Sequence, residues 1–336
     1  EETFAIGWVS GTSAGAVNAV ALAAGLAEGG RDGARAKLKQ VWDGVQKAGV
    51  PDLLRLNPFL YSLSRTTPMA QMASLLSPYD FNPLGFDPLR RLLAEVIDFK
   101  RLQEAEGPEL LIAATEIATG HARLFRRREL TLDAVLASCC LPTLHHAVII
   151  EGRAYWDGGF SANPDLVTLA GESPADDTLI VLVNPFVQMA LPTGAREISG
   201  HANRLTFNAP LLRDVELIET ARDAFRGRWR KGKGRLQHLA AHRFHLIEAE
   251  KYTGALSHDS KMKPDKALLT SLHSAGRTEA GRWLDSHRRD AGRRATVDLA
   301  EKFLHPKLAL LPRTAAAETP PTSGESPSAS GETPAA

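Results

Sequence analysis

The stretch that decides the fold is Gly11-Thr12-Ser13-Ala14-Gly15, a G-x-S-x-G pentapeptide between an apolar run and a helical pattern. The apolar run is Ile6-Gly7-Trp8-Val9, and residues 16–26 (A-V-N-A-V-A-L-A-A-G-L) supply the helical pattern. A serine between a strand and a helix, with a glycine on each side, is typical of a nucleophile elbow. The N-terminal N–H groups of the helix would then face an oxyanion formed at the serine. A glycine-rich turn with Ser13 as the helix cap is the structural alternative.

A nucleophilic serine needs a base, and an aspartate is the best candidate in this chain. Asp157 follows the apolar run 147–150 and the turn at Gly152, and it precedes Gly158 and Gly159. This pattern predicts a carboxylate at the end of a strand, with the following backbone close by. A plain hairpin turn is the alternative for the Asp-Gly-Gly segment. The eleven histidines have no comparable setting, so we expect them to be surface or packing residues.

Together, the G-T-S-A-G and D-G-G motifs resemble those of the patatin-like phospholipases, which hydrolyse acyl esters with a Ser–Asp dyad. Further segments resemble bacterial members of this family, and the resemblance extends from about residue 4 to residue 305. These segments lie at residues 82–84, 87–90, 137–142, 152–159, 183–186 and 293–299. The combination is far more specific than any one of the motifs.

The resemblance implies a fold, a site and a substrate class. The fold would be an α/β three-layer α/β/α sandwich with a mainly parallel central sheet and a helical C-terminal extension. Ser13 would be the nucleophile, Asp157 its general base, and the backbone N–H of Ala14 an oxyanion donor. The glycines of the two motifs are Gly11, Gly15, Gly158 and Gly159. The substrate would be a lipid or another acyl ester, hydrolysed through an acyl-enzyme, with no metal and no organic cofactor.

The chain departs from the family pattern before Ser13. Members carry a glycine-rich loop, G-G-G-x-[RK]-G, whose N–H groups bind the oxyanion, and residues 1–12 contain no such loop. We therefore expect a fragment without the first strand, the oxyanion loop and most of the first helix, and poorly active in this form. Two alternatives stay open. One is a non-catalytic member that binds a membrane or a partner, and the other is a hydrolase of a non-phospholipid ester.

The chain divides by pattern into three stretches. Residues 1–186 alternate apolar runs with helical patterns, which predicts the catalytic core, a mainly parallel sheet covered on both faces. Residues 187–312 are predicted to be a mostly helical continuation of the same domain. Residues 313–336 are rich in Pro, Ser, Thr and Glu without apolar periodicity, so we expect a disordered tail.

Within these stretches the sequence predicts individual elements. Buried strands are expected at 110–115 and 178–183, and an amphipathic helix at 211–225. The elbow helix is expected to end at Glu28-Gly29-Gly30. The proline-punctuated segment 51–88 is expected to pack as short helices, with a lid or an acyl-binding wall as the alternative.

Composition bounds the partners. The 40 basic and 39 acidic residues nearly balance, and no recognised module is present, so we expect no nucleic-acid partner. The basic cluster 226–235 is read as a solvated loop, with peripheral contact to anionic lipid as the alternative. The sequence has no run of about 18 apolar residues, so no membrane span is predicted. The expected location is cytoplasmic, peripheral at a membrane in that alternative, and secretion stays open. The adjacent Cys139 and Cys140 are expected to be buried thiols.

Overall fold

The structure is a computed structural model that describes residues 4–55, 77–189, 191–226, 234–253 and 266–308. Residues 227–233 of the basic cluster, 56–76 of the proline-punctuated segment and the whole stretch 313–336 lie outside the described residues. The chain divides into Glu1–Pro306 and Lys307–Ala336, and every element named below belongs to the first of these units.

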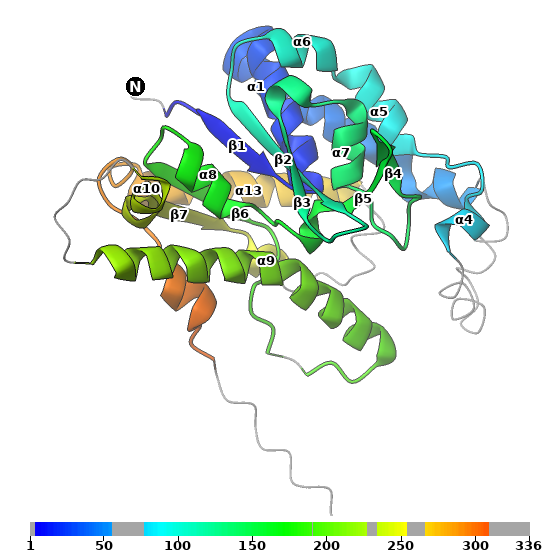
Figure 1. Cartoon of the computed structure of the whole chain (residues 1–336). Coiled ribbons are helices and arrows are strands. Elements are labelled where there is room, and N and C mark those ends of the chain that lie inside the picture. The colour runs from blue at the N-terminus through cyan, green and yellow to red at the C-terminus, as the bar shows by residue number, and fades with distance from the viewer. Residues whose placement is uncertain (1–3, 56–76, 190, 227–233, 254–265, 309–336) are drawn as a thin grey trace, which may run out of the picture. The chain divides into compact units, whose positions relative to one another are not determined.

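The larger sheet has five strands in the part of the chain that the structure describes (Figure 1). They are β1 (Trp8–Gly11), β2 (Glu109–Glu116), β3 (Ala122–Arg126), β4 (Val148–Ile150) and β5 (Arg153–Asp157). β1 pairs with β2 in parallel, whereas β3 and β5 both pair with β2 antiparallel and β4 pairs antiparallel with β5. A second sheet pairs β6 (Asp177–Leu182) with β7 (Arg243–Glu248) in parallel.

The α/β class is confirmed, and the lengths of the connections explain the mixed pairing. Helices separate β1 from β2 and β6 from β7, and such crossovers allow parallel pairing. β4 and β5 are joined by Glu151 and Gly152 alone, with φ of 51° and 76°, which is a tight hairpin turn. Strands joined this closely can pair only antiparallel, and among the described residues parallel pairing is limited to β1–β2 and β6–β7.

The first hydrophobic core lies between the larger sheet and a group of helices. Buried Val20 of the elbow helix, Ile112 of β2 and Val135 are among its members. The helices of this group are α1 (Ala14–Arg55), α5 (Pro88–Val96), α6 (Phe99–Glu104) and α7 (Leu132–Ser138). The short α4 (Pro78–Phe81) precedes α5, and the turn η1 (Arg127–Glu129) precedes α7.

The helical stretch α1 reverses direction near Gly30, which has φ of 60°. The Trp42 Nε1–H donates to Asn18 Oδ1 at 2.8 Å, and Lys37 pairs with Glu28 at 2.7 Å, so the second half folds back on the first. The glycine pair that we expected to end the elbow helix therefore marks this reversal rather than the end of helical structure.

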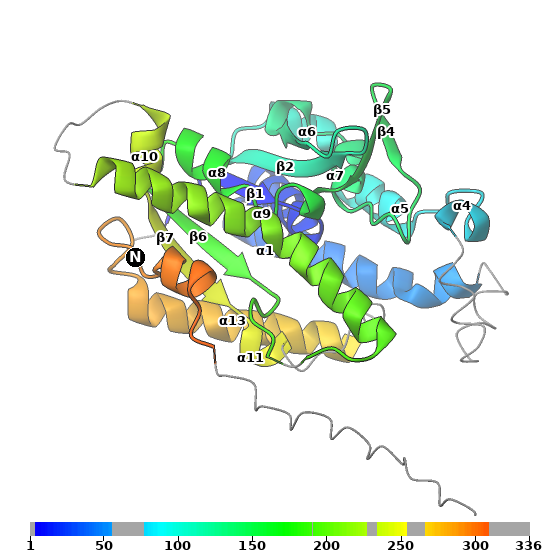
Figure 2. The same ribbon diagram turned by 60° about the horizontal axis from the view of Figure 1, so that its bottom comes forward.

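The second core joins the smaller sheet to the C-terminal helices. Buried Ile180, Val215, Ile218, Leu239 and Phe244 form part of it. Its helical elements are α8 (Leu166–Glu172), α9 (Ala195–Phe225), α10 (Arg235–Ala241) and the π-helical turn η3 (Ala300–Leu304). The remaining helices are α11 (Glu250–Thr253) and α13 (Lys266–His287). α9 contacts α8, α10 and the turn η2 (Gly158–Phe160), and Figure 2 shows α8 and α10 beside it. The expected helical C-terminal region is confirmed, and β7 is an additional strand within it.

Candidate functional site

The register of three strands brings Ser13 and Asp157 together. Gly11 at the end of β1 lies opposite Ile112 of β2, and Asp157 at the end of β5 lies opposite Ala114. β3 occupies one edge of β2 over residues 111–115, so β1 and β5 must use the other edge. They approach that edge from opposite directions and end two residues apart. The elbow and the Asp-Gly-Gly turn therefore face each other.

The turn at Ser13 has a strained backbone. Ser13 has φ of 55°, a backbone conformation that residues other than glycine rarely adopt. Its backbone N–H donates to the Ser138 Oγ at 3.0 Å, and the Thr12 hydroxyl donates to the Ala162 carbonyl at 2.7 Å. Ala14 is exposed and opens α1, where a backbone N–H has no intrahelical acceptor. That N–H is therefore available to an oxyanion beside Ser13.

Asp157 is a buried carboxylate without an ionic partner among the described residues. Its side chain is 0% exposed, and Oδ1 accepts from the Gly159 N–H at 2.8 Å. Oδ2 is also buried, and in the described part of the chain no hydrogen bond of ordinary geometry reaches it. Burial raises the pKa of Asp157 to about 6, against the lowering effects of the Gly159 N–H and the Ser13 side chain. The carboxylate is thus a stronger base than an exposed aspartate.

Three of the four motif glycines are required by close packing. A side chain on Gly11 would collide with the carbonyl of Gly15, and one on Gly158 with the carbonyl of Ala113. A side chain on Gly159 would collide with the ring of Phe207 in α9. Nothing lies within 4 Å of the position that a Cβ on Gly15 would take, so packing does not explain this glycine.

Ser138 is a site residue that the sequence reasoning did not single out. It is 0% exposed at the end of α7, and its hydroxyl oxygen holds the backbone of Ser13. It lies in the segment 137–142, which carried part of the family resemblance but gave no sign of this contact.

Helix α9 also supports the site in a way that the sequence did not reveal. Asn163 Nδ2 donates to the Phe207 carbonyl at 3.0 Å, and the rings of Phe160 and Phe207 lie 4.8 Å apart. Asp214 Oδ2 accepts from the backbone N–H of Leu166 at 2.8 Å. The chain that follows Asp157 is therefore held by α9 at several points.

The two cysteines are free thiols. Burial, followed by the charges of Asp157 and Asp87, raises the pKa of Cys139 well above its ordinary value. Cys140 is buried, and burial raises its pKa to about 11. Their thiols donate to the carbonyls of Ser13 at 3.3 Å and His146 at 3.0 Å. Neither thiol is activated as a nucleophile.

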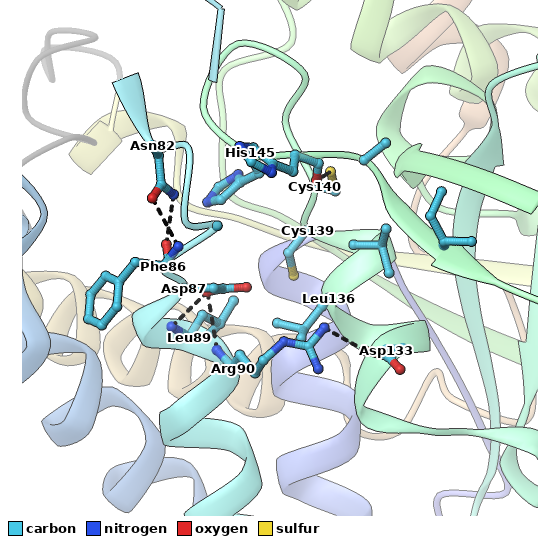
Figure 3. A pocket seen from close by; sticks show the side chains of 15 residues that line it. Asn82, Phe86, Asp87, Leu89, Arg90, Asp133, Leu136, Cys139, Cys140 and His145 are labelled. Atoms are coloured by element: carbon cyan, nitrogen blue, oxygen red, sulfur yellow. Dashed lines mark hydrogen bonds and ion pairs between the residues drawn. The ribbon is translucent and has the colours of Figure 1, made fainter. Parts of the chain in front are cut away.

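A cavity of about 390 Å³ is lined by residues around Asp87, Cys139 and His145 (Figure 3). Cys139 lines it, and the same residue donates its thiol hydrogen to the Ser13 carbonyl. Ser13 and Asp157 are not themselves among the lining residues. The cavity is therefore linked to the backbone of Ser13 through Cys139.

The described residues contain no group of three His, Cys, Asp or Glu side chains placed to hold a metal ion. His242 and His245 are each 2% exposed, and their ring nitrogens contact Thr178 and Asp177 in the second core. No helix among the described residues is long and apolar enough to cross a bilayer.

Comparison with known proteins gives one family. Residues 8–170 match the family model described as patatin-like phospholipase. No curated protein matches the chain. The matched segment contains both the elbow and the Asp-Gly-Gly turn.

Proposed function

Through residues 8–170 the chain belongs to the patatin-like phospholipase family, and on that premise we propose that it hydrolyses lipid carboxylic esters. Ser13 is the nucleophile and Asp157 is the general base. The observation that carries the proposal is the unpartnered, fully buried Oδ2 of Asp157 beside a serine with φ of 55°. A dyad hydrogen bond often tightens only when substrate is bound, so this open geometry suits a resting site.

The first half of the reaction forms an acyl-enzyme. Asp157 Oδ2 takes the proton of the Ser13 hydroxyl while Ser13 Oγ forms a bond to the ester carbonyl carbon. The carbonyl oxygen becomes an oxyanion, stabilised by the Ala14 N–H and by the positive end of the helix that begins there. The tetrahedral intermediate then breaks its bond to the alcohol oxygen, which takes the proton from Asp157. The acyl group is left on Ser13.

The second half releases the acid. Asp157 accepts a proton from a water molecule, whose oxygen bonds to the acyl carbon. The bond from that carbon to Ser13 Oγ then breaks, and the serine oxygen takes the proton back from Asp157. The products are a free carboxylic acid and the original dyad.

The pKa of about 6 suits this work. A carboxylate with an ordinary pKa of 3.8 is a poor acceptor for a hydroxyl proton. Burial strengthens the base, and the group still ionises at neutral pH, where a base must be unprotonated.

The decisive experiment labels the nucleophile. We expect a fluorophosphonate probe to attach to Ser13 of this chain, located by mass spectrometry. Hydrolysis of a medium-chain p-nitrophenyl ester and of phospholipid micelles should be lost in Ser13→Ala. Ser10→Ala is the matched control, because the Ser10 hydroxyl is buried without a partner in the described residues and its loss removes no hydrogen bond. Labelling at another residue, or full activity of Ser13→Ala, would overturn the proposal.

A further inference from the structure

The turn after Asp157 has an open side at Gly159, and an aromatic ring from α9 fills it. The position that a Gly159 Cβ would take overlaps two ring carbons of Phe207, and it lies 3.0 Å from Asp157 Oδ1. A side chain at residue 159 would therefore meet both the ring and the carboxylate. Because residue 159 is glycine, the Phe207 ring comes close to the fully buried carboxylate.

Phe207 is held in this place by the segment that it covers. Its ring lies 4.8 Å from the Phe160 ring, and its carbonyl accepts from Asn163 Nδ2 at 3.0 Å. The same segment is tied to the elbow, since the Thr12 hydroxyl donates to the Ala162 carbonyl at 2.7 Å. The segment after the base thus connects α9 to the elbow.

The ring has two effects on the carboxylate. Apolar carbon in the place of water disfavours the ionised form, and burial is the largest contribution to the raised pKa of Asp157, about 6. The ring also limits the movement of Gly159, whose N–H donates to Asp157 Oδ1 at 2.8 Å. That bond fixes the carboxylate and leaves Oδ2 for the serine proton.

The titratable groups of the neighbouring elements do not replace these effects. The thiols of Cys139 and Cys140, which follow α7, stay protonated below pH 8, because the pKa of each is raised. Asp214 of α9 also has a pKa of about 6, and its Oδ2 accepts from backbone N–H groups of α8. Ala114 of β2 lies opposite Asp157 and carries no charge. Burial and hydrogen bonds therefore set the pKa of Asp157, without a charged side chain among the described residues.

We propose that Phe207 is a positioning residue of the Ser13–Asp157 dyad, whose ring keeps water from the carboxylate and holds Gly159 against it. The inference rests on the proposed ester hydrolysis, and it adds to the site a residue outside the matched segment 8–170. Gly159 does not have a positive φ, so glycine is needed there for the space that it leaves to the ring.

The test follows the ionisation of Asp157 through the N–H group that contacts it. In protein containing isotope-labelled glycine, the Gly159 amide signal should titrate with a midpoint near pH 6. The signal is identified by the loss of this titration in Asp157→Asn. In Phe207→Ala, water reaches the carboxylate, so we expect the midpoint to fall by about one pH unit. Phe207→Leu keeps part of the apolar cover and should give a smaller fall.

Phe186→Ala is the matched control. Phe186 is also half-buried and also packs against another ring, that of Phe303 at 5.0 Å, but it does so in the second core. We expect this variant to lose stability as Phe207→Ala does and to leave the Gly159 midpoint unchanged. Urea unfolding of each variant shows that the protein compared is folded.

Kinetics give a second readout that a purely structural role would not move. At pH 8, where Asp157 is ionised in each protein, kcat of Phe207→Ala should fall about tenfold with little change in KM, because the base is weaker and less firmly held. A midpoint that stays near pH 6 in both Phe207 variants, an equal shift in Phe186→Ala, or a loss confined to KM would overturn the inference. Failure of Ser13 labelling would overturn the reaction. The Gly159 titration needs no turnover, so it would still decide whether Phe207 shields the carboxylate.

Discussion

Asp157 and Asp177 both lie at the end of a strand, yet their surroundings are opposite. Asp157 ends β5 with no cation beside it in the described structure, and burial raises its pKa to about 6. Asp177 begins β6, and burial would raise its pKa too. Hydrogen bonds from Arg243, His245 and the Gly292 N–H outweigh that effect and hold its pKa well below the ordinary value. The Arg243 Nη2–H donates to Asp177 at 2.7 Å, and His245 Nε2 lies 2.9 Å from its carboxylate.

The difference separates a carboxylate that is kept reactive from one that holds the fold together. The donors around Asp177 bond to its ionised carboxylate, so protonation of this group weakens native contacts. Asp157 keeps one oxygen free, so it can take a proton without losing a contact. A place at the end of a strand does not by itself decide the role of an aspartate. The hydrogen-bond donors that the rest of the fold places around the carboxylate decide it.

The largest expected effect is on catalysis. Asp157→Asn keeps the acceptor for the Gly159 N–H and removes the base, so we expect kcat/KM to fall by about 10³-fold or more. Asp177→Asn should leave kcat of the folded protein nearly unchanged. In the wild type, kcat/KM should fall about tenfold per pH unit below about pH 6, as Asp157 becomes protonated. A pH-independent rate between pH 4 and 6 would exclude Asp157 as the base.

The next effect is on stability, and it belongs to Asp177. Asp177→Asn removes the carboxylate that contacts Arg243 and His245 most closely and should lower the free energy of unfolding at pH 7 by about 3 kcal/mol. Because the folded pKa is depressed, the wild-type protein has this stability above about pH 4 and loses it as the pH falls further. Urea unfolding at pH 7 and pH 3 measures both. Asp176→Asn is the control, since Asp176 is largely exposed and pairs with Arg243 at 3.5 Å only. Equal losses in both variants would contradict the comparison.

The same comparison predicts that removing the other charge stabilises the protein. Raising the pKa of Asp157 from 3.8 to about 6 corresponds to about 3 kcal/mol lost by holding the ionised group buried. This cost is absent below about pH 4, where the carboxyl is protonated in both states, and complete above about pH 6. We expect Asp157→Asn to unfold at higher urea at pH 8, with a gain of about 2 kcal/mol, because the new amide lacks a full set of acceptors. If Asp157→Asn is instead less stable at pH 8, the ionised Asp157 carboxylate is stabilised by its surroundings, and the predicted cost of burying it is wrong.

The smallest effect concerns the serine side of the site. Ser138→Ala removes the acceptor of the Ser13 N–H and should cost about 1 kcal/mol of stability. It touches neither Asp157 nor Asp177, so the pH dependence of both stability and activity should keep its wild-type shape. A shift of the pH midpoint of activity would mean that Ser138 also sets the environment of Asp157.

The sequence predicted the parts of the site that depend on local chemistry. A serine held at positive φ in a tight turn between a strand and a helix needs glycines near it in the sequence, and these are visible as a motif. An aspartate followed by two glycines likewise indicates the end of a strand. The strands at 110–115 and 178–183 were predictable from their apolar runs and match β2 and β6.

The parts that were not predictable depend on register and on distant contacts. That β1 and β5 end on the same edge of β2 follows from pairing, which no local pattern encodes. Ser138 bonds to the Ser13 backbone and Phe207 packs against Gly159, and both contacts join segments that are distant in the sequence. Strand β7 lies within a mostly helical stretch, where its short apolar run does not stand out.

The grip of α9 on the chain after Asp157 has a consequence for protein engineering. The family match ends at residue 170, but the segment within it that holds Asp157 is fastened to Phe207 and Asp214 beyond that boundary. A recombination crossover placed at residue 170 between two related genes would pair a loop from one parent with a helix from the other. Chimeras should keep the surroundings of Asp157 intact only when the crossover falls before β5 or after Asp214. The segment that must be inherited from one parent is therefore longer than the segment that matches the family model.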